Sequence, residues 1–217
     1  RKAVASEIEE RILIERRSSN MMMFDMRPCS DATFNDLDTE LFFNNYLPKA
    51  IDREILDNDK RDIKEQLAAL RFYNLAHDKP TNAGILLFGR NPEYFMPGAY
   101  IQFVKFTGVS LGSDIENEKK FSGNLVKILN DIDSFIENAI IKQRPVPTST
   151  LQETIKKNYP NWALRELLMN AIMHRDYESN APIKFYQFEN RIEIGNAGGL
   201  YGKARPENFP NENDYRN

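Results

Sequence analysis

The segment LRELLMNAIMHRDY carries three polar side chains that could do chemistry, and each follows the last by four residues. They are Glu166, Asn170 and His174. Because four residues advance an α-helix by about 400°, side chains at this spacing form one slowly drifting row. The apolar stripe expected on the same helix consists of Leu164, Leu167, Leu168, Ala171 and Ile172. The row should lie beside this stripe and be partly shielded from water, where a hydrogen bond or metal contact is stronger.

An ordinary helix at the edge of a core explains the same spacing without a ligand. Glu166 and Asn170 would then be a simple i, i+4 pair, and His174 would interact with the dipole at the helix C-terminus. The segment RIEIGNAGGL favours a ligand site, because its strand is expected to end at Asn196, just before Gly198 and Gly199. Paired glycines let the backbone approach a ligand closely and leave amide groups for phosphate, although plain turns use them too.

Hydrophobic periodicity predicts the elements that hold these residues in place. Strands are expected at 84–89 (GILLFG), 99–106, 183–188 and 191–195, and helices at 121–140 and after Pro160. The order strand, strand, helix, helix, strand, strand predicts an α+β fold in which helices are layered on one face of a mixed sheet. The NEKK run (117–120) is expected to be a solvated loop, and the prolines of RPVPTST are expected to end the long helix.

The first part of the chain is expected to be helical. Helices are predicted at residues 1–17, from about 36 to 48, and from about 58 to 72, separated by loops rich in turn-forming residues. This part has no strand-like alternation, so it should form a helical segment before the sheet.

Composition restricts the classes of function. A hydrophobic fraction of 41% with 28% charged residues is typical of a soluble globular protein. We expect no membrane span, because no stretch approaches ~18 apolar residues. One cysteine, Cys29, excludes an internal disulfide and a cysteine-based zinc site, and it fits the cytoplasm. The net charge of −3 argues against the whole chain coating nucleic acid.

Together, RELLMNAIMHRDY and RIEIGNAGGL resemble the ATPase-like domain of transcriptional regulators often labelled RecG-like. PTNAGILLFG and PGAYIQFVKFTG are similar to the middle region of the same family, so the resemblance covers the chain from about Glu10 onward. Proteins of this family carry a Schlafen-type (Alba-like) DNA-associated domain before this region and a winged helix after it. The resemblance implies an N-terminal helical segment at 1–20, a helical connector at 21–80 and an ATPase-like sandwich at 81–217, truncated before its lid.

The ATPase-like part is in turn similar to the GHKL superfamily of gyrase, Hsp90, histidine kinases and MutL, a helix layer over a mixed sheet. There, one helix carries a glutamate and, four residues later, an asparagine that binds the Mg²⁺ bridging the phosphates. The resemblance implies ATP and Mg²⁺ as cofactors, with Glu166 as general base and Asn170 as Mg²⁺ ligand. It also implies that the nucleotide site includes His174, Asn196, Gly198 and Gly199.

Two departures limit what the resemblance implies. The superfamily places an aspartate where this chain has Asn196, whose amide oxygen can accept from adenine but brings no charge. The glycine-rich lid would lie beyond the last residue, so we expect weaker nucleotide binding and no hydrolysis by this chain alone. A helicase motor is not expected, because the phosphate-binding pattern G-x-x-x-x-G-K-[ST] is absent from the sequence.

Three functions therefore remain open. The first is a cytoplasmic, DNA-associated transcriptional regulator with a divergent ATP-binding domain, in which DNA is contacted by domains outside this sequence. The second is a Mg²⁺-dependent ATPase that uses Glu166 as its base. The third is a nucleotide-free module for partner docking or for assembly of a homo-oligomer. In all three, we expect little direct DNA binding by this chain.

Overall fold

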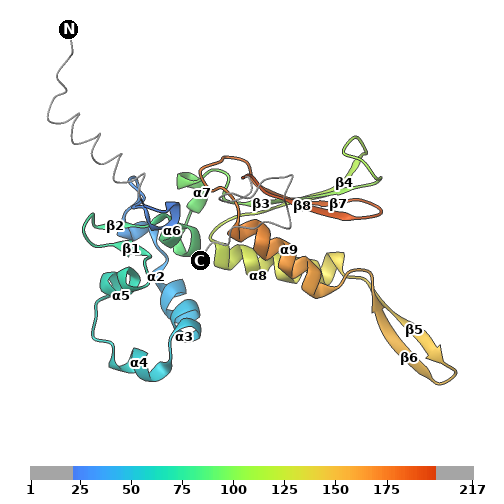
Figure 1. The fold of residues 1–217 in the computed structure, drawn as a ribbon, viewed down its shortest axis with the longest axis horizontal. Helices are drawn as coiled ribbons and strands as arrows, with labels where there is room; N and C mark the ends of the chain where they lie inside the picture. The colour runs from blue at the N-terminus through green and yellow to red at the C-terminus, as the bar shows by residue number, and fades with distance from the viewer. Residues whose placement is uncertain (1–21, 199–217) are drawn as a thin grey trace, which may run out of the picture. The chain divides into compact units, whose positions relative to one another are not determined.

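The structure, a computed structural model, describes residues 22–198. The helix predicted at 1–17 and the second glycine of the bend, Gly199, lie outside the described residues. The chain forms two compact units (Figure 1). Among the described residues, unit 1 comprises 22–95 and 123–129, and unit 2 comprises 96–122 and 130–198. No helix within residues 22–198 is long and apolar enough to cross a membrane.

Unit 1 is mainly helical and has an aromatic core. Its elements are η1 (Phe24–Met26), η2 (Phe34–Asp36), α2 (Thr39–Leu41), η3 (Phe42–Tyr46), α3 (Leu47–Ala50), α4 (Arg53–Asn58), α5 (Ile63–Ala69), β1 (Tyr73–Asn74), β2 (Lys79–Pro80), α6 (Asn82–Phe88) and α7 (Pro92–Phe95). The rings of Phe42, Tyr46, Phe72 and Phe88 contact one another with centroids 5.0–6.5 Å apart. Of the two helices predicted here, the first is present as a continuous helical run from Thr39 to Ala50 with a π-helical middle, and the second is present in shorter form as α5.

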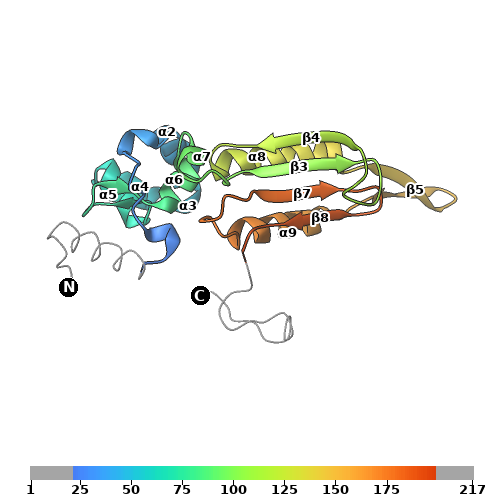
Figure 2. The same cartoon turned by 90° about the horizontal axis from the view of Figure 1, so that it is seen from above.

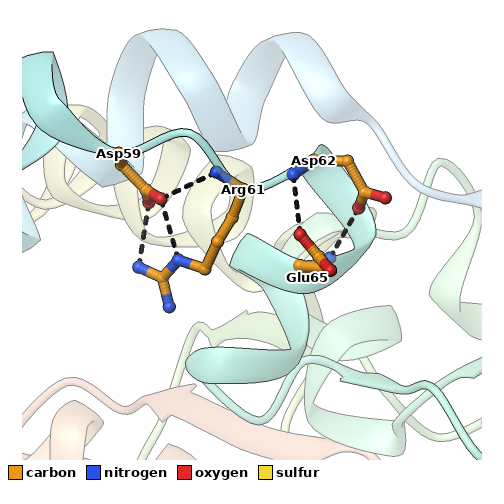
Figure 3. A network of polar contacts seen from close by, with 4 residues as sticks. All are labelled: Asp59, Arg61, Asp62 and Glu65. Atoms are coloured by element: carbon orange, nitrogen blue, oxygen red, sulfur yellow. Dashed lines mark hydrogen bonds and ion pairs between the residues drawn. The ribbon is translucent and has the colours of Figure 1, made fainter.

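The start of α5 shows how local sequence sets an element boundary (Figure 3). The Glu65 amide donates to Asp62 Oδ1 at 2.9 Å, and the Asp62 amide donates to Glu65 Oε2 at 3.0 Å, which is a capping box. Just before it, the Arg61 guanidinium donates to both carboxylate oxygens of Asp59, at 2.8 and 2.9 Å. These hydrogen bonds lower the pKa of Asp59 to about 2. The helix therefore begins at Ile63, five residues later than the sequence suggested.

The GILLFG run is a helix, so the strand predicted at 84–89 is wrong. Helix α6 begins after Thr81, whose hydroxyl oxygen accepts a hydrogen bond from the Gly84 amide at 3.1 Å. An added Cβ at Gly84 would lie 2.1 Å from the Phe72 carbonyl oxygen, so glycine is needed for this close approach. Ile85 and Phe88 are fully buried. A short apolar run between glycines suits a buried helix as well as a buried strand, and periodicity alone does not distinguish them.

Unit 2 contains a mixed four-stranded sheet in the order β4-β3-β7-β8. Its strands are β3 (Ile101–Phe106), β4 (Ile115–Phe121), β7 (Ile183–Gln187) and β8 (Ile192–Gly195). The central pair, β3 and β7, is parallel, and both outer pairs are antiparallel. The prediction of an α+β fold with helices packed on a mixed sheet is confirmed, with β4 in the place assigned to 84–89.

Helices cover one face of this sheet (Figures 1 and 2). They are α8 (Leu125–Phe135), which enters unit 2 at residue 130, its π-helical continuation η4 (Ile136–Ile140), and α9 (Asn161–Met173). The Phe103 ring on β3 packs 4.8 Å from Phe135 and 5.2 Å from Phe185 between centroids. Phe103 is 1% exposed, so these rings form the contact between sheet and helix layer.

Three strands, β4, β5 and β6, replace expected loops. The charged run that includes NEKK is strand β4, exposed along most of its length, with Phe121 as its buried end. The prolines of RPVPTST do end the long helix, but they lie within β5 (Gln143–Ser149), which pairs with β6 (Gln152–Lys157) in a separate two-stranded sheet. Neither segment shows the alternation of a half-buried strand, because neither has a buried face.

Candidate functional site

Helix α9 places the three polar residues that the sequence singles out. It begins after Pro160, as predicted, and ends at Met173, with His174 as its C-cap. The residues that it buries are Leu164, Leu168, Ala171 and Ile172. Leu167, expected in the same stripe, is 49% exposed. The buried arc is therefore narrower than predicted and is centred away from Leu167.

The predicted partial burial of the polar row is not observed. Glu166, Asn170 and His174 are all exposed. At about 100° per residue, Glu166 points roughly opposite to the centre of the buried arc, and Asn170 is the next residue round the helix toward His174. The correction follows from the narrower stripe: without Leu167, the row lies on the outward side of α9 and not at its buried edge.

Glu166 and Asn170 are nevertheless in direct contact. The Asn170 side-chain amide donates to Glu166 Oε1 at 3.3 Å. This hydrogen bond holds the two side chains together and uses the amide nitrogen of Asn170 as donor, so the Asn170 Oδ1 remains an acceptor. The pair thus presents carboxylate and amide oxygens, which are the ligand types that Mg²⁺ prefers in proteins.

The bend after β8 contacts the C-terminal end of α9. This contact is needed if residues of both segments are to form one site. The Asp176 amide donates to the Ala197 carbonyl at 2.8 Å, so the bend after β8 is tied to the turn after α9. Gly198 has φ +122°, which side chains of L-residues rarely adopt. A Cβ at Gly198 would lie 3.4 Å from both the His174 carbonyl oxygen and Asp176. His174 and Gly198 are therefore neighbours, and Gly198 is needed for its backbone conformation.

Asn196 lies on the same bend and is exposed. Its side-chain amide donates to the Ala197 carbonyl at 3.3 Å. Its Oδ1 is then the atom that could accept a hydrogen bond from an adenine amino group. The structure thus collects His174, Asn196 and Gly198 at one end of α9, with Asn170 and Glu166 one and two turns back along the helix.

Arg175 is a structural residue of this region, and the sequence predicted no role for it. It is 4% exposed, and its guanidinium donates to the carbonyls of Ser179 at 2.7 Å and Ala181 at 2.8 Å. Its Nη1 is buried without a hydrogen-bond partner, and burial lowers the pKa of Arg175. A Cβ at Gly98 would lie 2.2 Å from Arg175 Nη2, so a side chain at 98 would displace the guanidinium. Gly98 and Arg175 are far apart in the sequence, so no local sequence pattern predicts that they meet.

Tyr177 completes the turn after α9. Its hydroxyl donates to the Ile172 carbonyl at 3.0 Å, and the Arg175 guanidinium lies 4.6 Å from the centre of its ring. Burial raises the pKa of Tyr177 to about 12. Together with Arg175, it fixes the turn against which the bend after β8 is hydrogen-bonded.

The donor set fits a cation held mainly by a ligand's own phosphates. Within residues 22–198, no group of three or more histidine, cysteine, aspartate or glutamate side chains could hold a metal ion. Mg²⁺ commonly binds through one or two carboxylates plus phosphate oxygens and waters. This pair offers one carboxylate, that of Glu166, beside the Asn170 amide. Two open hollows lie elsewhere: one of about 490 Å³ on the β5–β6 sheet and one of about 370 Å³ at residues 48–53 and Ile55. Neither is lined by Glu166 or Asn170.

Comparison with known proteins gives a fold likeness. No family model and no curated protein matches the sequence. The crystal structure of the DIP2311 protein from Corynebacterium diphtheriae matches with a TM-score of 0.57 and 18% sequence identity. The match covers 92% of this chain and 38% of that one, so this chain spans less than half of the longer protein. At this identity, the likeness concerns the fold alone.

Proposed function

We propose that this chain is the nucleotide-binding part of a DNA-associated transcriptional regulator, with a divergent ATP-binding domain in unit 2. The observation that carries the proposal is the Glu166–Asn170 hydrogen bond on a helix that covers a mixed sheet. The contact between the Gly198 bend and the end of that helix supports it. This arrangement agrees with the GHKL resemblance in the sequence.

Each residue has a stated task in the proposal. Asn170 holds Mg²⁺ through Oδ1, and the metal supplies charge neutralisation for the phosphates when it is bound. Asn196 accepts from the adenine amino group, and Gly198 lets the backbone approach the ligand. Glu166 orients Asn170 and is the group that could take a proton from an attacking water. Contact with the regulated DNA site is assigned to parts of the protein outside this chain.

Thermal unfolding of the chain with and without Mg-ATP tests the proposal. A ligand at a hundredfold excess over its dissociation constant stabilises the fold by ~2.7 kcal/mol. For a protein of this size, this corresponds to an increase in Tm of roughly 5–10 °C. Asn170→Ala should abolish the increase and should leave the Tm without nucleotide nearly unchanged, because Asn170 is exposed.

The matched control is Asn138→Ala, another exposed asparagine of unit 2, whose side chain bonds only the Ser134 carbonyl. This variant should keep the full Mg-ATP response of its own baseline. Absence of any response in the wild-type chain up to millimolar Mg-ATP rejects the nucleotide proposal. An equal response in the wild type and Asn170→Ala rejects the assigned site.

A second function, docking of a partner or of another copy, is favoured by one observation. Trp162 and Met173, which are 73% and 63% exposed, lie on the same side of α9 as Glu166. They lie about 16 Å apart along the helix axis, so a partner that contacts both must lie along this face of α9. Sedimentation separates the two functions: docking between copies predicts a dimer that Trp162→Ser converts to monomer, with no effect of Mg-ATP.

A further inference from the structure

Strands β5 and β6 form a ribbon that no other element within residues 22–198 covers. All residues of β6 are exposed, and in β5 only Val146 is partly buried. Figures 1 and 2 both show the ribbon projecting beyond the four-stranded sheet of its own unit. An uncovered two-stranded hairpin is only marginally stable in water. A projecting arm of this kind therefore points to a role in binding another molecule.

The ribbon is basic although the chain is acidic. Between residues 142 and 158 there are four basic side chains and one acidic side chain, while the whole chain has a net charge of −3. The basic residues are Lys142, Arg144, Lys156 and Lys157. Positive charge is therefore concentrated on the arm.

The strand register places two of these cations directly opposite each other. Arg144 pairs with Lys156 across the ribbon, so both side chains lie on the same face. Like charges directly opposite on neighbouring strands destabilise a sheet. Lys142, two residues before Arg144, extends the same face. Within the described part of the chain, none of these three cations forms an ion pair with a carboxylate. An anion bound on this face would remove the repulsion.

The outer edge of β5 disfavours another strand as the partner. The Asn158 amide donates to the Lys142 carbonyl at 3.0 Å, so in an antiparallel pair residues 143, 145 and 147 point their backbone nitrogens outward. Two of these are Pro145 and Pro147, which have no N–H to donate. A second chain therefore cannot extend the sheet along this edge in the usual way.

We propose that the β5–β6 ribbon binds duplex DNA, lying in the major groove with Lys142, Arg144 and Lys156 on the phosphate backbone. The major groove of B-form DNA, about 12 Å wide, admits a two-stranded ribbon. Lysine and arginine contacts to phosphate position a protein without reading sequence. The deep, narrow major groove of A-form RNA does not admit such an element. This goes beyond the proposed function, which leaves DNA contact to other parts, and it replaces the expectation of little DNA binding.

Fluorescence anisotropy with a labelled 24-base-pair duplex tests the proposal on the whole chain. Three phosphate contacts predict that affinity falls roughly fortyfold between 50 and 200 mM NaCl. Arg144→Ala combined with Lys156→Ala leaves one contact, so affinity at 50 mM should fall at least tenfold and the salt effect should shrink to roughly fourfold. The control Lys49→Ala with Arg53→Ala removes two exposed cations of unit 1 and should bind like the wild type. Circular dichroism checks that each variant folds, and Arg144→Gln with Lys156→Gln is the second ribbon variant.

Several results overturn the proposal. These are the absence of salt-dependent binding by the wild type, equal loss in the control, or unchanged binding by both ribbon variants. Equal affinity for an RNA duplex of the same sequence overturns the groove assignment. A change in sedimentation mass in the ribbon variants without a change in DNA binding identifies the arm as an interface between copies. The Mg-ATP response is measured separately, so either proposal can fail while the other stands.

Discussion

The two long antiparallel hairpins of unit 2, β3–β4 and β5–β6, carry similar numbers of basic residues. The contacts that these basic side chains make differ between the two hairpins. On β4, Lys119 lies 4.9 Å from the Phe121 ring centre and 5.0 Å from that of Phe135, and Lys120 lies 4.2 Å from that of Tyr100. On β3, Lys105 forms an ion pair with Glu116. On β5–β6, Arg144 and Lys156 lie opposite each other in the strand register, and neither takes part in an ion pair with another described residue.

The difference teaches that a charged strand becomes part of a fold when its charges have partners within it. The β3–β4 hairpin is joined to β7 through the parallel pair and packs Phe103 beneath it. Its lysines then rest on aromatic rings, where a cation is attracted to the ring face. In the described part of the chain, the β5–β6 ribbon has neither a third strand nor a buried face. Its charges therefore remain available to an external partner.

The largest expected contrast concerns apolar side chains. Phe103→Ala should lower the free energy of unfolding by ~3–5 kcal/mol, because a fully buried ring leaves a cavity between sheet and helices. Ile155→Ala on β6 should change it by less than ~0.5 kcal/mol, because this side chain is 64% exposed. Urea denaturation followed by circular dichroism measures both. A cost of several kcal/mol at Ile155 would show that the ribbon is part of the core.

An intermediate effect is expected from pH. The folded-state pKa of Tyr177 is raised to about 12 by burial, above its ordinary value of 10.0. The unfolded chain therefore loses this proton first, so the stabilisation is complete below pH 10 and is lost as pH rises toward 12. The loss amounts to ~2–3 kcal/mol for this group. Between pH 9 and 12, the free energy of unfolding should fall more steeply for the wild type than for Tyr177→Phe. Parallel curves for the two proteins would contradict this prediction.

The smallest effect is a difference in sign between the two hairpins. Lys156→Glu places opposite charges across from each other on the ribbon and should stabilise it by ~0.2–1 kcal/mol. Lys119→Glu on β4 removes a cation from two rings and should destabilise its hairpin by ~0.5–1 kcal/mol. Amide hydrogen exchange of each hairpin measures the local free energy of opening. If both substitutions changed the free energy of opening in the same direction, the distinction between the two hairpins would be wrong.

The sequence predicted the elements that have a buried stripe. Helix α9 and the β7–β8 hairpin lie where periodicity places them, because one side of each contacts the core. Periodicity misassigned GILLFG, which is a short, fully apolar helix capped by Thr81. It also missed β4, β5 and β6, whose pairing is set by partner strands and not by burial.

For the candidate site, the sequence predicted the spacing but not the exposure. The i, i+4 contact of Glu166 with Asn170 follows from helix geometry and is present. Their outward direction depends on Leu167, whose exposure is a tertiary property. The Arg175 guanidinium beside Gly98 could not be predicted, because the two residues meet only through the fold.

The parallel pairing of β3 with β7 has a consequence for synthesis of the chain. Ile101 must pair with Ile183, so the four-stranded sheet cannot close until β7 and β8 have left the ribosome. The β3–β4 hairpin can form locally long before then, with the second edge of β3 still unpaired. Charged side chains, lysine above all, discourage pairing of an exposed strand with another chain, so the NEKK run on β4 protects the outer edge of this half-formed sheet.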